Sequence, residues 1–282
     1  MKRFLVLVGC LIFAAGVLAG CGGKPTQENA GGSNTPANGS SNTPAKLVVG
    51  ATAKPHAEIL EIVKPILQKE NVDLEIKVFT DYVLLNPALN DKQIDANFFQ
   101  HTPYLEDYNA KNNANLSYTV KVHTEPMGVY SKKVEKLDTL SDGASIGIPN
   151  DATNGGRALA VLQEAGLLKL KDGAGVTATD RDIVENPKKL KIQMMDAAML
   201  PRALEDLDVC VINSNYALEA NLNPVQDSIF MEAKDSPFAN ILAVRPEDKD
   251  KDSIKKLGQA LQSPEVKKFI EDNYKGSVVP AF

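Results

Sequence analysis

Beyond residue 45, apolar and polar residues follow two different periods along the chain. Short apolar or alternating runs that end in Gly, Pro or Asn predict strands, and apolar positions three and four residues apart predict helices. Strand patterns occupy residues 46–51, 72–79 and 94–99, and helical patterns occupy residues 56–69 and 84–93. The first part of the chain therefore alternates strands with helices, as α/β proteins do.

A second series of the same kind follows a polar stretch near residues 123–143. It comprises strands at 144–149, 190–195, 208–213 and 240–246, and helices at 155–165, 199–206, 215–221, about 251–262 and 264–274. Alternation of this length predicts an α/β fold with largely parallel sheets. We expect two lobes, with residues 46–128 and about 232–282 in lobe 1 and about 129–231 in lobe 2.

The first 45 residues indicate where the protein works. Met1-Lys2-Arg3 precedes an apolar run that is too short for an ordinary membrane span and ends in Leu18-Ala19-Gly20-Cys21, which resembles the lipobox of bacterial lipoproteins. A plain secretory signal is the alternative. We expect a signal peptide at 1–20, a lipid on Cys21 and a flexible polar tether over 21–45, which would hold the body at the extracytoplasmic face of a cell membrane.

Composition excludes several classes of function. The net charge of −5 argues against a nucleic-acid surface. After signal removal and lipidation one cysteine remains, Cys210, whose apolar neighbours in DVCVIN predict a buried, inert thiol. The cysteines and histidines lack zinc-type spacing, so we expect no metal and no cofactor. The body is expected to be a monomer.

The segment IPNDATNGGRALAVLQEAG, residues 148–166, has the pattern of an anion site. A strand ends at Pro149, Asn154 is placed to cap the next helix, and the two glycines would let the backbone approach a ligand. Arg157 follows in the predicted first turn, where its guanidinium would hold a carboxylate through two parallel hydrogen bonds. The alternative is an exposed arginine on an ordinary helix.

The segment ANFFQHTPYLEDYNA, residues 96–110, gathers aromatic side chains where a strand gives way to a helix. Phe99, His101 and Tyr104 follow the strand end, and Tyr82 lies on an earlier loop. Ligands of α/β sheets bind at the carboxyl ends of strands, and an aromatic wall suits an apolar ligand side chain. Alternation places only one of Phe98 and Phe99 at the pocket. The alternative is that these rings belong to the core or shield a helix end.

Asparagines occupy two further strand boundaries. CVINSNYA contains Asn213 and Asn215, and SPFANILAV places Asn240 at the start of a strand. An amide side chain can accept from an ammonium group and donate to a carboxylate. Turn or cap chemistry is the alternative for each of them.

Four motifs in order carry a family resemblance: FFQHTPYLEDYN, DATNGGRAL, DVCVINSNYALEANL and SPFANILAVRPEDKD. Together they resemble the methionine-binding lipoproteins of the NlpA lipoprotein family, the substrate-binding components of D/L-methionine ABC importers. The resemblance covers about residues 46–282. It implies a two-lobed, type II periplasmic-binding-protein fold with a ligand cleft between the lobes. It also implies methionine as ligand and an ABC permease with a cytoplasmic ATPase as partner.

The resemblance also implies roles for the polar residues. Arg157 matches the arginine that holds the substrate carboxylate, and Asn240 matches an asparagine that binds the amino-acid head group. Asn213 and Asn215 both fall in a motif that contributes one asparagine, and the choice between them stays open.

The aromatic residues match the family pattern as well. Phe99, His101 and Tyr104 correspond to the aromatic wall, and Tyr82 corresponds to the tyrosine at its start. Leu85 stands where relatives often carry proline, which puts the local loop geometry in doubt.

Three alternatives remain beside methionine capture. The nearest is a binder of the same fold for another amino acid or a methionine-containing dipeptide, which co-purified ligand would distinguish. A two-lobed enzyme would need an acid–base or nucleophile set, but His101, the only histidine beside a candidate site, has no Ser or Cys partner nearby in sequence. A surface adhesin is the third alternative. His56 and His123 receive no role.

Overall fold

The computed structural model describes residues 43–233 and 237–282 of the chain. The expected signal peptide, Cys21 and the tether as far as residue 42 lie outside the described residues. Of the helices in these two ranges, none is at once long and apolar enough to cross a membrane. Two main β-sheets and a small two-stranded sheet make up the β-structure of the described residues.

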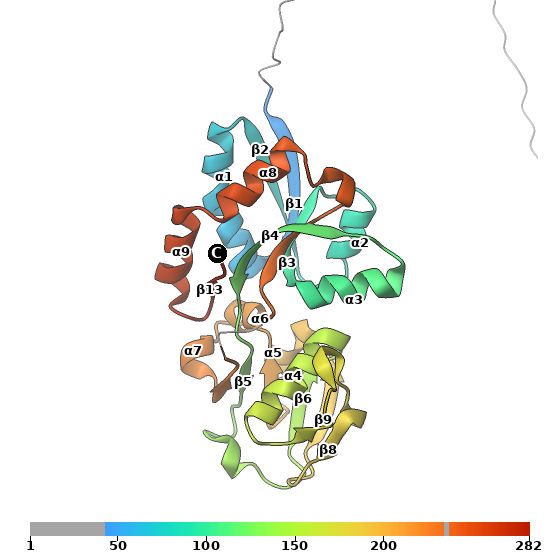
Figure 1. Ribbon diagram of the computed structural model, residues 1–282. Helices are drawn as coiled ribbons and strands as arrows, with labels where there is room; N and C mark the ends of the chain where they lie inside the picture. Colours follow the sequence, from blue (N-terminus) through green and yellow to red (C-terminus); the bar gives the residue numbers. More distant parts are fainter. Residues whose placement is uncertain (1–42, 234–236) are drawn as a thin grey trace, which may run out of the picture. The chain divides into compact units, whose positions relative to one another are not determined.

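A six-stranded sheet combines the beginning and the end of the described chain, in the order β13-β4-β12-β3-β1-β2 (Figure 1). Its strands are β1 Ala45–Thr52, β2 Val72–Phe79, β3 Ala96–His101, β4 Ser117–Thr124, β12 Asn240–Val244 and β13 Val279–Pro280. Strand β1 runs parallel to β2 and β3, whereas β12 runs antiparallel to β3 and β4, and β13 runs antiparallel to β4.

Helices from both ends of the chain cover this sheet. They are the short π-helical turn η1 Ala53–Ala57, then α1 Glu58–Lys69, α2 Leu85–Asn90, α3 Thr102–Asn112, η6 Pro246–Asp248, α8 Asp252–Leu261 and α9 Pro264–Tyr274. Helix α1 packs against α8 and α9 (Figure 1). Its apolar stripe explains this position, since Leu60, Val63 and Leu67 are buried in one cluster with Leu47 and Val49 of β1.

A five-stranded sheet, ordered β11-β5-β10-β6-β9, contains the middle of the chain. Its strands are β5 Gly128–Tyr130, β6 Ser145–Pro149, β9 Lys191–Met195, β10 Val209–Ile212 and β11 Phe230–Met231. Its helices are α4 Ala152–Glu164, α5 Leu200–Ala203, α6 Ser214–Glu219 and α7 Pro224–Asp227, with 3₁₀ turns η2 Leu137–Thr139, η3 Gly175–Thr177, η4 Asp180–Asp182 and η5 Ala197–Met199. Strands β7 Lys169–Leu170 and β8 Ile183–Glu185 form the two-stranded sheet.

The chain crosses from the first sheet to the second between β4 and β5 and returns before β12. The prediction of largely parallel sheets is right for β2-β1-β3 and for β9-β6-β10 but wrong for the other pairings, which are antiparallel. A parallel pair needs a long crossover, usually a helix, and α1 lies in the crossover between β1 and β2.

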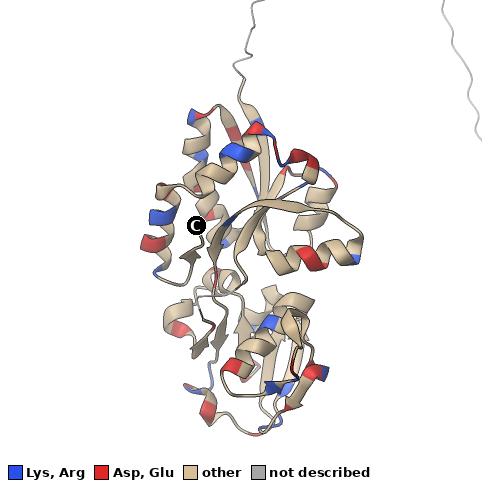
Figure 2. Cartoon of the chain, viewed as in Figure 1, with Lys and Arg blue, Asp and Glu red and all other residues tan. Residues whose placement is uncertain are grey.

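Charged residues of both signs lie close together on the outer helices (Figure 2). Lysines and acidic residues both occur along α1, α8 and α9, and Figure 2 shows the two colours on these helices. The net charge of −5 is therefore spread among many surface positions of the described chain.

Candidate functional site

All eight predicted site residues line one pocket. They are Tyr82, Phe99, His101, Tyr104, Arg157, Asn213, Asn215 and Asn240. Four residues that were not predicted to bind ligand complete the lining, namely Gln100, Glu125, Asn154 and Ser214. Together these residues bound about 340 Å³ of space outside the protein atoms, part of which is open to solvent.

Strand ends position these side chains. Phe99 and His101 lie near the C-terminal end of β3. Asn240 is the first residue of the neighbouring strand β12, where it pairs with His101. Phe98 points the other way and is buried in the core of the six-stranded sheet. The prediction that only one of the two phenylalanines reaches the pocket is confirmed.

Three rings form an aromatic corner of the pocket. The ring centroids of Tyr82 and Phe99 lie 5.7 Å apart, those of Phe99 and Tyr104 also 5.7 Å, and those of Tyr82 and Tyr104 6.0 Å. The Phe99–Tyr104 pair is edge-to-face, with an angle of 81° between the planes, which is a favourable aromatic arrangement. Such a corner offers polarizable ring faces and edges to an apolar ligand side chain.

His101 joins this corner to the polar side of the pocket. Its Nδ1 accepts a hydrogen bond from the backbone N–H of Tyr104 and so caps α3, which leaves Nε2–H to donate to Asn154 Oδ1 at 3.2 Å. Burial, with a contribution from the positive charge of Arg157, lowers the pKa of His101 to about 3. His101 is therefore a neutral donor at physiological pH rather than a cation.

A chain of amides fixes which end of Asn213 faces the pocket. The carboxylate of Asp151 can only accept, so both of its oxygens face Asn154 Nδ2, at 3.1 Å each. Asn154 Oδ1 then accepts from Asn213 Nδ2 at 2.8 Å. Asn213 Oδ1 is buried and has no hydrogen-bond partner among the described residues. Asn213 therefore presents an acceptor, although it occupies the N-cap position of α6 without a side-chain capping bond.

The other two asparagines present donors. The hydroxyl of Tyr82 donates to Asn215 Oδ1 at 2.5 Å, and Asn215 Nδ2 is buried without a partner in the described chain. Asn240 Oδ1 faces His56 Nε2 at 3.1 Å, which leaves its Nδ2 for other partners. Amide ends are assigned from such partners.

Arg157 occupies a different setting from the predicted one. Helix α4 begins at Ala152, so Arg157 lies in its second turn, and its guanidinium is buried beside the carboxylate of Glu232. Arg157 Nε lies 3.1 Å from each Glu232 oxygen, and Nη2 donates to Glu232 Oε2 at 2.5 Å and to the carbonyl of Glu125 at 2.7 Å. Among the described residues, Nη1 has no hydrogen-bond partner. Arg157 therefore cannot hold a ligand carboxylate through both Nη atoms. Only its Nη1 is left to donate to a ligand.

The start of α4 also corrects the expected anion site. Asp151, rather than Asn154, is the N-cap, and its carboxylate accepts from the Asn154 N–H at 2.9 Å. The positive helix end thus holds an internal anion. The glycines serve close packing instead of ligand approach, because a Cβ on Gly155 would lie 2.8 Å from the Pro149 carbonyl oxygen and one on Gly156 2.3 Å from that of Val176.

Sequence patterns missed the two acidic residues of the site. Glu125 lines the pocket directly after β4, and Glu232 pairs with Arg157. The signal for β4 was present, because Val120 and Val122 alternate with polar residues, but the polar stretch after it concealed the strand. A carboxylate just past a strand end, as in Glu125, is the same signal that identified His101. Nothing local to Glu232 indicated its partner.

The pocket offers both hydrogen-bond donors and hydrogen-bond acceptors. Arg157 Nη1, Asn215 Nδ2 and Asn240 Nδ2 are donors, whereas Asn213 Oδ1 and the Glu125 carboxylate are acceptors. The hydroxyl of Ser214 already donates to the Pro126 carbonyl oxygen. Cys210 is buried outside the pocket, and burial raises the pKa of its thiol to about 12. In the described part of the chain, the pocket therefore offers binding groups for a zwitterion and no paired nucleophile and base.

Known proteins share this fold and sequence. A family model described as NlpA lipoprotein matches residues 47–282. The methionine-binding lipoprotein MetQ of Bacillus subtilis is 41% identical, covering 99% of both chains. A nutrient-binding protein from Burkholderia cenocepacia, solved bound to methionine, is 47% identical with a TM-score of 0.82, covering 84% of this chain and all (100%) of that one. A periplasmic substrate-binding protein of an ABC transporter from Coxiella burnetii is 40% identical with a TM-score of 0.80, covering 83% and 100%. The predicted α/β fold of periplasmic binding proteins is confirmed.

Proposed function

Because this chain belongs to the NlpA lipoprotein family, we propose that it is a substrate-binding lipoprotein that captures methionine and delivers it to an ABC importer. The relative from B. subtilis is named a methionine-binding lipoprotein, and the B. cenocepacia protein was solved with methionine. The observation that carries the proposal is the pocket itself, in which donors, acceptors and an aromatic corner face one another.

Each part of methionine has a partner in this proposal. The ligand carboxylate accepts from Arg157 Nη1 and from the Nδ2 groups of Asn215 and Asn240. The ligand ammonium donates to Asn213 Oδ1, so both asparagines of the CVINSNYA motif contact the ligand, through opposite ends of the zwitterion. Hydrogen bonds to charged groups contribute about 1.5–3 kcal/mol each, so the head group decides that an amino acid binds.

The aromatic corner decides which amino acid binds. Sulfur–ring contacts contribute about 0.3–1.5 kcal/mol each, and Tyr82, Phe99 and Tyr104 offer several ring surfaces to a thioether. An aliphatic side chain of the same length fills the space but lacks these contacts. Methionine should therefore bind several-fold more tightly than norleucine.

The setting of this capture follows from the family and from the N-terminus. We propose that Cys21 carries lipid, that the segment to residue 45 is a tether, and that the body works at the extracytoplasmic face of the cell membrane as a monomer. The body would act as two lobes, residues 46–128 with about 232–282 and residues about 129–231. Its partner would be the permease of the importer, with its cytoplasmic ATPase.

The ligand is identified in two steps. Mass spectrometry of the purified protein should detect co-purified methionine, and calorimetry after unfolding, dialysis and refolding should show methionine bound more tightly than norleucine. A co-purified dipeptide, or micromolar binding of another amino acid without methionine binding, would favour the same fold with a different cargo.

Matched substitutions test the assigned residues. Arg157→Ala should weaken methionine binding at least tenfold, whereas Arg202→Ala, at an exposed position on α5, should leave affinity unchanged. Tyr104→Ala should weaken methionine more than norleucine, whereas Tyr108→Ala, one turn further along α3 and outside the pocket lining, should affect both equally or not at all. Unchanged affinity in Arg157→Ala would remove its carboxylate role.

A further inference from the structure

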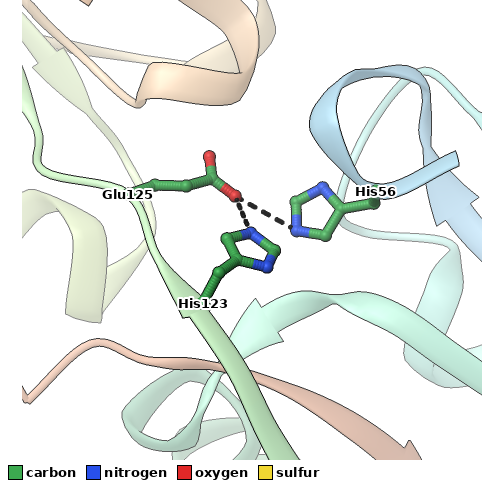
Figure 3. Close-up of side chains that lie close together, drawn as sticks. All are labelled: His56, His123 and Glu125. Carbon is green, nitrogen blue, oxygen red and sulfur yellow. Dashed lines mark hydrogen bonds and ion pairs between the residues drawn. The ribbon is translucent and has the colours of Figure 1, made fainter. Parts of the chain in front are cut away.

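Two histidines converge on the carboxylate of Glu125 behind the pocket (Figure 3). His123 Nε2 lies 2.7 Å from Glu125 Oε1, and His56 Nε2 lies 3.2 Å from the same oxygen. The three residues are almost fully buried, at 1% exposure for His56, 0% for His123 and 6% for Glu125. Figure 3 shows the other carboxylate oxygen of Glu125 directed away from both rings.

Both histidines are neutral hydrogen-bond donors in this cluster. Burial lowers the pKa of His56 to about 4 and that of His123 to about 3. His56 Nε2 faces two acceptors, Asn240 Oδ1 at 3.1 Å and Glu125 Oε1 at 3.2 Å, which assigns the ring proton to Nε2 and leaves Nδ1 to accept from the hydroxyl of Thr52 at 2.8 Å. His123 Nε2 therefore donates to Glu125 Oε1, and His56 Nε2, which donates to Asn240 Oδ1, lies 3.2 Å from the same Glu125 oxygen. The Glu125 carboxylate also lines the pocket.

An ionised Glu125 has no matching cation in this cluster. The ion-pair partners of the Glu125 carboxylate within the described residues are the two neutral histidines. The nearby guanidinium of Arg157 contacts the backbone carbonyl of Glu125 and gives its charge to Glu232. Burial raises the pKa of Glu125, while His56, Arg157 and the backbone N–H of Asn215 oppose that rise. A buried carboxylate in this position is stabilised when a cation arrives from the pocket.

We propose that Glu125 binds the ammonium group of the ligand, and that His56 and His123 are positioning residues that aim its carboxylate at the pocket. This inference rests on the proposed function, since it takes the ligand to be an amino acid. Asn213 Oδ1 and the Glu125 carboxylate then share the ammonium protons. His56 has a second effect, because it holds Asn240 Oδ1 and so turns Asn240 Nδ2 toward the ligand carboxylate. The His56 ring thereby orients groups at both ends of the ligand, Glu125 toward the ammonium and Asn240 toward the carboxylate.

The ligand class follows from this arrangement. The three residues proposed to face the ammonium side, His56, His123 and Glu125, are buried. Acylation removes the positive charge that Glu125 matches. The pocket should therefore accept a free amino acid and reject its N-acylated form.

A metal ion is the competing occupant of the same three residues. Their ligand atoms lie within 4.8 Å of one another, and His, His and Glu are typical zinc ligands. The contacts at 2.7 and 3.2 Å are hydrogen-bond distances, which favours shared protons over a metal in the cluster.

Ligand analogues test the proposal on the unaltered protein. Calorimetry with the full-length lipoprotein in detergent compares L-methionine with 4-(methylthio)butanoic acid, which lacks the amino group, and with N-acetylmethionine. We expect both analogues to bind at least 100-fold more weakly than methionine. Analogue binding within threefold of methionine overturns the role of Glu125. Failure of methionine itself to bind overturns the proposed function, and this inference with it.

Variants separate the ammonium role from a merely structural one. Glu125→Gln should weaken methionine at least tenfold and leave 4-(methylthio)butanoic acid unchanged, so that the preference for the amino group shrinks. His123→Ala should shrink the same preference, and His123→Gln, which keeps an N–H donor, should restore part of it. Glu61→Gln on the exposed face of α1 is the matched control and should change nothing.

Two results would overturn the proposal. Equal loss of both ligands in Glu125→Gln would mean that the residue only supports the fold. Stoichiometric zinc in the purified protein, with methionine affinity altered by a chelator, would make the cluster a metal site. If Glu125→Gln does not fold, the analogue comparison on the unaltered protein still decides.

Discussion

The ion pair between Arg157 and Glu232 predicts a large energetic coupling. Both side chains are buried, at 4% and 7% exposure, and three contacts of 2.5–3.1 Å join the guanidinium to the carboxylate. Glu232 Oε2 also accepts from the backbone N–H of Met127 at 3.0 Å. Removing one partner of such a pair leaves the other charge buried and uncompensated, at a cost of about 3–5 kcal/mol.

The substitutions Arg157→Met and Glu232→Gln, alone and together, measure this coupling. We expect Arg157→Met to lower the free energy of unfolding by about 3–5 kcal/mol, which corresponds to a fall in Tm of about 6–20 °C for a body of this size. Glu232→Gln keeps an acceptor for Met127 and should cost about 1.5–3 kcal/mol through the lost charge. The double variant contains neither charge, so its cost should fall short of the sum by at least about 2 kcal/mol.

Urea unfolding of ligand-free protein, monitored by circular dichroism, supplies the four free energies. Removal of ligand is necessary because bound methionine would add its own stabilisation. Lys46→Met and Glu75→Gln form the control cycle, since that ion pair is exposed and should show little or no coupling. Costs of Arg157→Met and Glu232→Gln that add to within about 0.5 kcal/mol would refute the reasoning, because independent sites behave in that way.

Three further predictions concern other parts of the molecule. The unfolding free energy should decrease as the pH falls from about 6.5 toward 4, because histidines bind protons in the unfolded chain but stay neutral when buried in the folded one. Each histidine contributes at most about 1.4 kcal/mol per pH unit, and Glu125, whose pKa is raised by burial, opposes the trend. Constant stability in urea titrations across this pH range would contradict the prediction. The histidines are His56, His101 and His123. Gly156→Ala should lower the unfolding free energy by about 1–3 kcal/mol, since the new Cβ would lie 2.3 Å from the Val176 carbonyl oxygen; an unchanged or higher Tm would show that α4 can move away. Cys210 should react with DTNB slowly in the native protein and rapidly after unfolding in urea, because burial raises its pKa to about 12; fast native labelling would mean that the five-stranded sheet opens.

Pocket residues were easiest to predict from the sequence where they lie at the ends of strands. The sequence placed Phe99, His101 and Asn240 at one site because the end of β3 and the start of β12 meet at the same edge of the sheet. Local periodicity also located α1, α8 and α9, since each has a buried apolar stripe. Such features depend on nearby residues alone.

Features that depend on distant partners could not be predicted. Arg157 and Glu232 are 75 residues apart, and nothing in either neighbourhood indicates that the guanidinium is already paired. The same is true of His56 and Asn240, which are 184 residues apart. The start of α4 was misplaced for a different reason, because Asp151 and Asn154 are both good capping residues and only the folded backbone chooses between them.

The connection of only three residues between β4 and β5 has a mechanical consequence. Glu125 lies in this short connection and its carbonyl oxygen accepts from Arg157 Nη2, so a change in the angle between β4 and β5 would be transmitted to that guanidinium. A glycine inserted into the connection should weaken this transmission while every side chain that lines the pocket is still present.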